Sequence, residues 1–494
     1  MSESWQEKYN KLESKIEEMI ADAVAKAVAE ATAVMAEELI KAKNEILRLR
    51  AIIDKDSSNS SKPPSTSDFK AKPNSREKSD KPQGGQKGHP GHRIKLPENI
   101  GELVDSGKVE MKVADYTNGN ENYVSRFTID VETRVTVTEH RYPLGMELPE
   151  CHYNEVSYGN EIKSKVILLM NEGIVAKKRL SEIISGMTHG IVSLSTGTID
   201  RFQSDFAKKL VESGELDAIE HDLLSNPIMC TDDTCLRTQE RIVYPEDEKS
   251  GESPTYEKAE KKSFKATVRT HSNKQSTLYT VNPKKDIKGI ERDGILPEYA
   301  GTLCHDHESK FFNYGSDNAS CGGHLSRALK GLRDLYKCPW AGEMRTFINE
   351  MNDYRNNDLS KNVLFCDPKK LTFFEEEYGR ILEEGRIALG QISEDDFGYV
   401  EFNAMLNRLI NHKHNYMLFM NDYNVPFTNN LAERDLRPEK TKQKVSGTFR
   451  SWDGIVSHAR IRSFISTVKK RGMDLCCAIR NVIQGDAVLT YTEQ

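Results

Sequence analysis

The chain has 494 residues and a formal net charge of −6; 37% of its residues are hydrophobic and 30% are charged. One hydrophobic core rarely grows to this length, so we expect about two to four domains. The sequence contains no run of about 18 apolar residues, which argues against a membrane protein. The opening residues, MSESWQEKYNKLESK, lack the charged-then-apolar order of a secretory signal, and we therefore expect a cytoplasmic protein.

The cysteines and the charges indicate the redox state of the thiols and the kind of partner that the protein can bind. The nine cysteines are scattered without a regular spacing, which predicts reduced thiols and no disulfides. The negative net charge would normally speak against a nucleic-acid partner, but positive charge is concentrated in two stretches. Residues 55–96 carry ten Lys or Arg against four Asp or Glu, and residues 434–471 carry eleven against three. DNA therefore remains a compatible partner.

The first two segments differ sharply in composition. Residues 1–54 have apolar residues at helical spacing, which predicts a long helix that forms a coiled coil between subunits. A helix that packs back on its own chain is the alternative. Residues 55–97 are dense in Ser, Pro, Gly and Lys and predict a basic flexible linker. This segment is either a plain linker or an arm that neutralises phosphates.

Two small units are expected next. Within residues 98–158 the run FTIDVETRVTVTEHRY alternates apolar and polar residues, which predicts a small β unit. Residues 159–222 contain three helical segments, the last opened by Ser193 and Ser195, and resemble a helix-turn-helix DNA-binding region. A three-helix bundle without any DNA role has the same sequence pattern.

A catalytic core is predicted from the order of the elements that follow. NPIMCTDDT, SFKATVRT and STLYTVNP read as three strands, followed by the helical stretch IKGIERDGILPEYA and a fourth strand, GTLCHDH. This is the order of a ribonuclease-H-like α/β sheet. We assign residues 223–339 and 417–475 to this core, residues 340–416 to a helical insertion and residues 476–494 to a C-terminal tail.

Acidic residues at the ends of two of these strands point to phosphodiester chemistry. Such chemistry is served by two metal ions about 3.5 to 4 Å apart, and Mg²⁺ prefers carboxylate oxygens. Asp232 and Asp233 lie on the first strand, where alternation sends them to opposite faces, so only one can meet the metals directly. Asp306 ends the fourth strand, which this order places beside the first. For any single Asp, a surface or helix-cap role is the commoner one.

The segment NNLAERDLRPEKTKQKVSGTFRSWDGIVSHARIRSFISTVKKRG closely resembles the C-terminal signature of the insertion sequence 66 family of bacterial transposases. CTDDTCLRT, CHDHESKFFNYG, CGGHLSRALKGL, SSNSSKPPSTSD and GGQKGHPGH match the same family, in its order, over nearly the whole chain. The resemblance implies a DDE-type transposase in which Asp232, Asp306 and Glu433 are the catalytic carboxylates. They would hold Mg²⁺ or Mn²⁺, and we expect two ions.

The resemblance also implies supporting residues. Asp233 completes an acidic pair, and Asn430 lies among the polar neighbours of the glutamate. Arg437 shares a helix face with Glu433 and either orients the carboxylate or binds a phosphate, with a plain surface pair equally expected. Cys321 and His324 match a Cys-x-x-His feature, with Arg327 one helical turn beyond. Two ligands do not make a zinc site, and the alternative is that Cys304, His305 and His307 complete one. We expect a polar support for Asp306 rather than zinc. Residues 97–150 lack the paired cysteines of the family's zinc module.

The implied reaction cleaves DNA at a transposon end to free a 3′-hydroxyl, which then attacks a target phosphodiester. Trp452 would stack at a distorted end, although a core tryptophan is commoner. The implied partners are double-stranded DNA, further copies of the chain, and accessory proteins of the element, with the protein on the nucleoid when bound. The alternatives are a catalytically silent DNA-binding protein and a nuclease without joining activity. Contacts to the DNA backbone are expected from Arg434, Arg437, Lys440, Lys442, Lys444, Arg450 and Arg462.

Overall fold

The computed structural model describes residues 5–56, 59–60, 96–107, 109–116, 121–149, 154–245 and 252–489. The chain divides into two compact units. The larger unit comprises residues 1–73, 156–180 and 195–494, and the smaller comprises residues 74–155 and 181–194. Most of the expected basic linker, residues 61–95, lies outside the described residues, as does Cys151.

The centre of the larger unit is a mixed sheet of five strands in the order β5-β4-β1-β6-β7. Strand β4 is antiparallel to both of its neighbours, β1 and β5. Strand β6 is parallel to both of its neighbours, β1 and β7. The predicted sequence of three strands, a helical crossover and a parallel fourth strand is confirmed. The strands are β1 (Ile228–Thr238), β4 (Phe264–Ser272), β5 (Thr277–Asn282), β6 (Thr302–His305) and β7 (Asp317–Ser320), with a separate hairpin of β2 (Glu240–Val243) and β3 (Thr255–Lys258).

Helices cover this sheet because its strands carry apolar side chains. On one face, Leu236 and Val268 pack against Trp452 and Ile455 of α15 (Trp452–Lys470), and α14 (Asn430–Ser446) crosses β1 and β4 beside it. The crossover between β5 and β6 contains α7 (Ile287–Asp293) and α8 (Ile295–Glu298). Around α15 lie α3 (Asn160–Asn171), α5 (Thr196–Glu212) and α6 (Glu215–Ser225). Helix α4 (Lys177–Met187) runs from the larger unit into the smaller.

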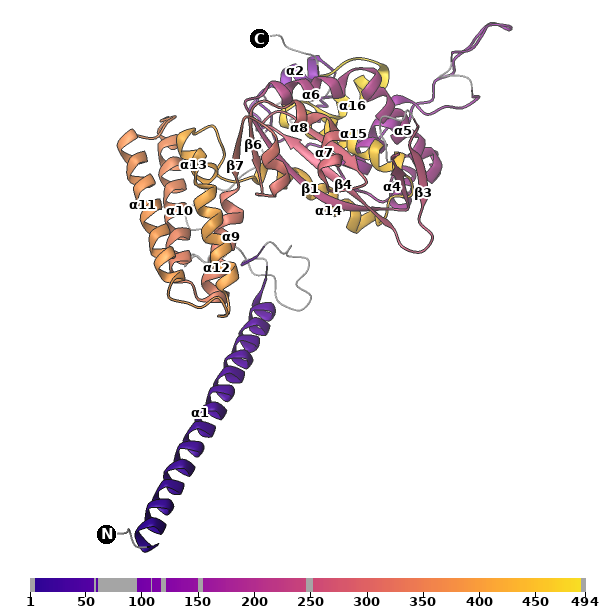
Figure 1. Ribbon diagram of the computed structural model, residues 1–494. Coiled ribbons are helices and arrows are strands. Elements are labelled where there is room, and N and C mark those ends of the chain that lie inside the picture. Colours follow the sequence, from indigo (N-terminus) through magenta and orange to yellow (C-terminus); the bar gives the residue numbers. More distant parts are fainter. Residues whose placement is uncertain are drawn as a thin grey trace. The chain divides into compact units, whose positions relative to one another are not determined.

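The predicted helical insertion is present. Figure 1 shows its helices side by side, and Trp340 stacks on Phe402 with ring centroids 5.1 Å apart. The same hydrophobic cluster includes Cys304 of β6, so the insertion shares its core with the sheet. The helix before the insertion is α9 (Gly322–Tyr336). The helices of the insertion are α10 (Pro339–Ser360), α11 (Pro368–Leu389), α12 (Tyr399–Asn411) and α13 (Lys413–Asn421).

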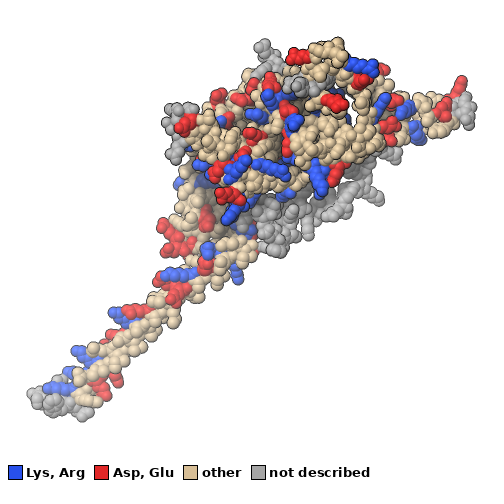
Figure 2. Space-filling view, turned by 90° about the vertical axis from the view of Figure 1, so that its right-hand side faces the viewer, with Lys and Arg blue, Asp and Glu red and all other residues tan. Residues whose placement is uncertain are grey.

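The predicted N-terminal helix is a single helix, α1 (Trp5–Asp54). Its large apolar side chains, such as Leu39 (71% exposed) and Ile53 (66% exposed), face solvent. Figure 2 shows Lys and Arg interspersed with Asp and Glu along this rod. No described helix is both long enough and apolar enough to cross a membrane.

One expectation about the fold was wrong. Residues 121–149 contain no strand, and Val131 and Val137 are each 87% exposed. An alternating pattern stabilises a strand only where a neighbouring strand accepts its backbone hydrogen bonds, and the short helix α2 (Ile100–Asp105) offers no such strand.

The region assigned to a C-terminal tail begins with α16 (Leu475–Gln484), which buries Ile479 and Val482 and packs on α3.

Candidate active site

The site begins with two aspartates on neighbouring parallel strands. Cys230 of β1 is paired with Cys304 of β6, and continuing this register by two residues brings Asp232 opposite Asp306. Asp306 directly follows β6 and its side chain accepts a hydrogen bond of 3.1 Å from the backbone N–H of Glu308. The carboxyl ends of parallel strands are where sites in open α/β sheets usually form. The sheet therefore brings together the first two predicted carboxylates.

The charge of the third carboxylate, Glu433, also acts on Asp232, although among the described residues these three carboxylates do not form a group close enough to hold one ion. The pKa of Asp232 is raised to about 7, first by burial and then by the neighbouring carboxylate of Asp306, with further contributions from Asp233 and Glu433. The pKa of Asp306 is raised as well, mainly by burial and by Glu308. Negative charge at this point is therefore costly, and a cation placed there would offset the cost.

Glu433 lies in the first turn of α14, and the residue before this helix anchors it. Asn429 is buried; its side-chain amide donates to the backbone oxygen of Thr231 over 2.7 Å. The backbone N–H of Asn429 donates to the Sγ atom of Cys321 over 3.2 Å. Asn430, the support expected from the sequence, is exposed. The adjacent Asn429 ties the start of α14 to the strand that carries Asp232.

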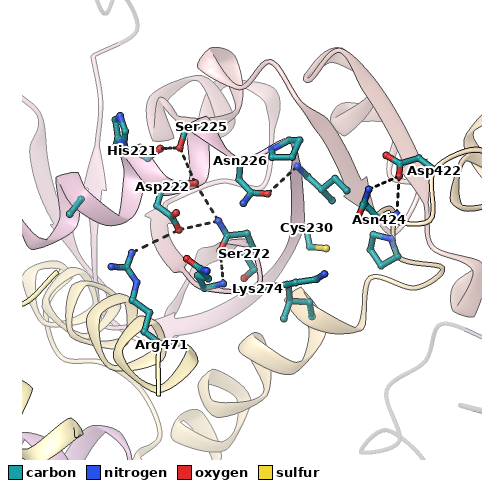
Figure 3. A pocket seen from close by; sticks show the side chains of 17 residues that line it. His221, Asp222, Ser225, Asn226, Cys230, Ser272, Lys274, Asp422, Asn424 and Arg471 are labelled. Atoms are coloured by element: carbon teal, nitrogen blue, oxygen red, sulfur yellow. Dashed lines mark hydrogen bonds and ion pairs between the residues drawn. The ribbon is translucent and has the colours of Figure 1, made fainter. Parts of the chain in front are cut away.

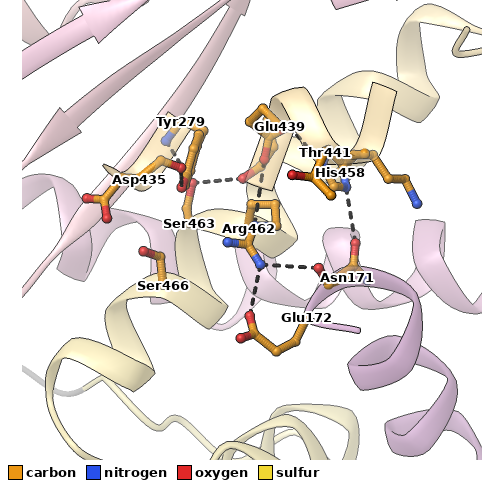
Figure 4. Close-up of polar contacts among 12 residues, drawn as sticks. Asn171, Glu172, Tyr279, Asp435, Glu439, Thr441, His458, Arg462, Ser463 and Ser466 are labelled. Carbon is orange, nitrogen blue, oxygen red and sulfur yellow. Dashed lines mark hydrogen bonds and ion pairs between the residues drawn. The ribbon is translucent and has the colours of Figure 1, made fainter. Parts of the chain in front are cut away.

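A second group of buried side chains holds the inward face of α14. The carboxylate of Asp435 accepts hydrogen bonds from Ser272 (2.7 Å) and Thr277 (2.9 Å) and forms an ion pair of 2.7 Å with Lys470. Four residues later, Glu439 contacts His458 at 2.9 Å and Arg462 at 3.7 Å (Figure 4). Sequence reasoning missed both acidic residues, although their spacing of four places them on one helix face.

The charges around Glu439 are balanced inside the protein. Burial acts to raise the pKa of Glu439, but His458 and Arg462 outweigh it and leave the pKa below its ordinary value. Arg462 also donates to the backbone oxygen of Asn171 over 3.2 Å and to Glu172 over 3.1 Å (Figure 4). Removing one partner of such a group would leave a buried charge without compensation.

The two adjacent aspartates have separate environments, as strand alternation predicts. Asp233 is paired with Arg269 across the antiparallel register and contacts its guanidinium at 3.6 Å. Lys285 and Lys310 lie 2.7 Å and 2.6 Å from its two carboxylate oxygens. Asp233 is therefore surrounded by cations of the protein itself, whereas Asp232 faces other carboxylates.

Histidines flank Asp306 without carrying positive charge near neutral pH. Burial lowers the pKa of His305 to about 4 and that of His307 to about 3. The backbone of His307 has a φ of 75°, a left-handed conformation that non-glycine residues adopt at a cost. Its ring stacks on Tyr416 and its Nδ1 atom lies 2.8 Å from the hydroxyl of Ser320. These contacts hold the backbone that follows Asp306.

The Cys-x-x-His feature lies beside Glu433. Cys321 precedes α9, and the chain here approaches Phe427 so closely that a Cβ atom on Gly322 would lie 2.2 Å from its ring. His324 places its Nδ1 atom 3.5 Å from the carboxylate of Glu433. The pKa of His324 is lowered by burial and by Arg327. The expected support for Asp306 is therefore a neighbour of Glu433 instead.

The expected DNA contacts divide into two groups. Arg434, Arg437, Lys440, Lys444 and Arg450 are exposed. Lys442, Trp452 and Arg462 are buried, each at 4% exposure, so their assignment to a DNA surface was wrong. Helical geometry explains why these side chains are buried. Lys442 lies on the inward face of α14, and Trp452 and Arg462 lie on the inward face of α15.

A large cavity lies elsewhere in the larger unit. It has a volume of about 1350 Å³ and opens where β1 begins, next to the turn between β4 and β5 (Figure 3). Within it, Asn273 donates to Asp222 over 3.1 Å and Arg471 lies 3.9 Å from the same carboxylate. The cavity lining contains none of the residues predicted for catalysis.

Comparison with known families identifies the family of this chain. Residues 155–457 match the family described as Transposase IS66 family, which is more than half of the 494 residues. The chain belongs to the IS66 transposase family. Residues 6–95 also match a family of unknown function, DUF6444. No curated protein and no solved structure matches the chain. Asp232, Asp306 and Glu433 of this IS66-family protein all lie within the matched range.

The raised pKa of Asp232 predicts a pH-dependent effect of Asp232→Asn on stability. The folded chain holds this proton more tightly than the unfolded chain, so the parent loses stability as the pH rises from about 4 to about 7. At pH 8, with a chelator present, we expect Asp232→Asn to be more stable than the parent by up to about 4 kcal/mol. Urea unfolding at several pH values measures this difference. If the extra stability of Asp232→Asn over the parent did not decrease towards pH 5, the raised pKa of Asp232 would be contradicted.

Proposed function

We propose that this IS66-family protein is a DDE transposase that cleaves DNA at transposon ends and joins the freed 3′-hydroxyl to target DNA. The observation that carries the proposal is the register of β1 and β6, which brings Asp232 opposite Asp306, together with the contribution of Glu433 to the raised pKa of Asp232. The sheet supports it, because three antiparallel strands followed by a parallel fourth are the arrangement of a ribonuclease-H-like core.

The proposed cofactor is Mg²⁺ or Mn²⁺, held as two ions by Asp232, Asp306 and Glu433. The donor atoms are of a suitable kind: these are carboxylate ligands that hard cations prefer, and burial, followed by the charge of Asp306, raises the pKa of Asp232 to about 7. When bound, the ions supply charge stabilisation at the phosphate and activation of the attacking oxygen.

The residues of the chain act by holding these carboxylates in place. Asn429 fixes the start of α14 to β1, while Asp435 and Glu439 hold the rest of the helix on the sheet. Asp233 draws Lys285 and Lys310 to its own carboxylate. A site held by buried contacts keeps the geometry that phosphoryl transfer needs.

The three carboxylates are tested by Asp232→Asn, Asp306→Asn and Glu433→Gln. With Mg²⁺ and a duplex that carries the element's terminal inverted repeat, we expect each change to lower cleavage and strand transfer by roughly 100-fold or more, because transition-state stabilisation is lost. Gel analysis of labelled products measures both steps. DNA binding, measured by anisotropy, should persist.

The matched control is Asp317→Asn, which changes an aspartate of the neighbouring strand β7 that contacts the exposed His414. It should retain activity. Full activity of any one of the three test variants would remove that residue from the site. Cleavage without joining in the parent chain would favour a nuclease, and binding without cleavage would favour a silent DNA-binding protein.

We also propose that DNA lies along the outward face of α14. The inward face buries Ala432, Asp435, Leu436, Glu439 and Lys442, so the exposed cations share the opposite side. Arg434, Arg437 and Lys444 follow one another at spacings of three and seven, which is one stripe of a helix, and Lys440 lies beside them. This stripe begins next to Glu433, where phosphates would need to approach.

The stripe predicts a specific change in salt dependence. Replacing Arg434, Arg437 and Lys440 by Ala should weaken DNA binding and reduce the slope of log K against log salt by about 0.9 for each phosphate that the variant no longer neutralises. Anisotropy titrations at several salt concentrations measure the slope. The control replaces the exposed Lys258, Lys261 and Lys262 near the β2–β3 hairpin. An unchanged slope in the α14 variant would exclude the stripe.

A second copy of the chain is proposed as the partner of α1. Leu39, Ala42, Ile46, Leu49 and Ile53 follow the alternating spacing of three and four that a coiled-coil seam requires. In this frame Glu38 and Glu45 occupy g positions, and Lys43 and Arg50 occupy the e positions five residues later. A parallel dimer sets each Glu against a cation of the partner helix, whereas an antiparallel dimer sets like charges against each other.

The charge pattern predicts the effect of Glu38→Lys combined with Glu45→Lys. In a parallel dimer these changes place Lys against Lys43 and Arg50, so we expect dissociation at concentrations where the parent is dimeric. Light scattering measures the mass. Mixing this variant with Lys43→Glu, Arg50→Glu should restore a dimer. An antiparallel dimer would not be destabilised by Glu38→Lys combined with Glu45→Lys. A parent chain that is monomeric would exclude a second copy of the chain as the partner of α1.

A further inference from the structure

Three side chains with potential metal-ligand atoms lie close together at the start of α9. The Sγ atom of Cys321, a ring nitrogen of His324 and a carboxylate oxygen of Glu433 all lie within 4.8 Å of one another. Among the described residues, this is the group of His, Cys, Asp and Glu side chains close enough to hold one ion. Cys321 and His324 are three residues apart at a helix start, and α14 supplies the third ligand.

The surroundings of Cys321 fit a metal-bound thiolate. Its side chain is buried, and the backbone N–H of Asn429 donates to its sulfur over 3.2 Å. Burial raises the pKa of the thiol, while the N–H groups of Asn429, His324 and Gly323 act to lower it. Hydrogen-bond donors and a helix N-terminus stabilise a thiolate once a cation displaces the proton.

His324 offers a buried ligand atom that the protein leaves unused. Its Nδ1 atom is buried and has no hydrogen-bond partner among the described residues. The nearest carboxylate oxygen, on Glu433, is 3.5 Å away, beyond an ordinary hydrogen bond. A buried polar atom without a partner costs free energy, and a cation between the ring and the carboxylate would satisfy both groups.

We propose that Cys321, His324 and Glu433 bind a thiophilic divalent cation of the Zn²⁺ class, with the fourth coordination position open. One sulfur, one nitrogen and one oxygen donor select Zn²⁺ or Co²⁺ over Mg²⁺, which prefers oxygen ligands. Three protein ligands with an open position is the arrangement of zinc sites that exchange a small ligand. The side chains of His324 and Glu433 are 20% and 22% exposed, so these two ligands are not fully enclosed by the protein.

This site has a consequence that rests on the proposed function. Glu433 is also the third carboxylate proposed to hold Mg²⁺, and a carboxylate bound to Zn²⁺ donates less electron density to a second cation. Zn²⁺ bound with Cys321 and His324 therefore draws Glu433 away from Asp232 and Asp306. The result is inhibition of DNA cleavage by a thiophilic cation in the presence of Mg²⁺.

Cobalt titration of the metal-free full-length chain tests the site without any DNA. We expect one equivalent of Co²⁺ to give a sulfur-to-cobalt charge-transfer band and the intense visible bands of a tetrahedral ion, both removed by Zn²⁺. Cys321→Ser should abolish the charge-transfer band. The control is Cys338→Ser, a cysteine that is similarly buried and likewise placed before a helix, α10, and this variant should keep the band.

His324→Asn provides a second variant in case Cys321→Ser does not fold. It should bind Co²⁺ at least about 10-fold more weakly, since even outer-shell partners contribute that much. Absence of a band in the parent chain would overturn the site, as would its survival in Cys321→Ser or its loss in Cys338→Ser.

A cleavage assay with Mg²⁺ and added Zn²⁺ tests the consequence. The parent should be inhibited, and any activity retained by Cys321→Ser should resist Zn²⁺. A cobalt spectrum without inhibition by Zn²⁺ would exclude Glu433 from the ligand set. A cobalt spectrum in a chain with no cleavage activity would leave the site standing and contradict the proposed transposase. Cleavage without a cobalt spectrum would contradict only the site.

Discussion

The side chain of Asp232 lies beside Asp306 at the edge where β1 and β6 run parallel, and ionisation of one carboxylate opposes ionisation of the other. This repulsion is the constraint around which the core is organised. Arg269, Lys285 and Lys310 contact Asp233 on the other side of β1, and Lys285 also acts to lower the pKa of Asp306. The pKa values of Asp232 and Asp306 nevertheless remain raised, because burial and the neighbouring carboxylates outweigh this effect.

Helix α14 connects this constraint to the rest of the molecule. Its inward face is held by buried polar contacts through Asp435 and Glu439, and its first turn is tied to β1 by Asn429. Its outward face carries the exposed cations. One helix therefore joins the third carboxylate to a basic surface, and the buried contacts fix how the two lie relative to each other.

Glu433 lies between two sets of potential metal-ligand atoms. On one side are the aspartates of β1 and β6, which offer oxygen ligands, and on the other are the sulfur of Cys321 and the ring of His324. Hard and soft cations prefer opposite sides of this boundary. A carboxylate in such a position can respond to which cation is available.

The sequence by itself determined the long helix α1, the order of β1, β4, β5 and β6, and the separation of Asp232 from Asp233, because these follow from local periodicity. It also identified Arg434, Lys442 and Arg462 as possible DNA contacts, but could not distinguish the exposed Arg434 from the buried Lys442 and Arg462. Only the tertiary structure decided that Lys442 and Arg462 are buried, that Asn429 rather than Asn430 anchors α14, and that Glu433 approaches Cys321 and His324. Residues 121–149 show the same limit, since their alternating pattern had no partner strand. Periodicity describes one element, whereas burial and ligand sets depend on the elements that pack against it.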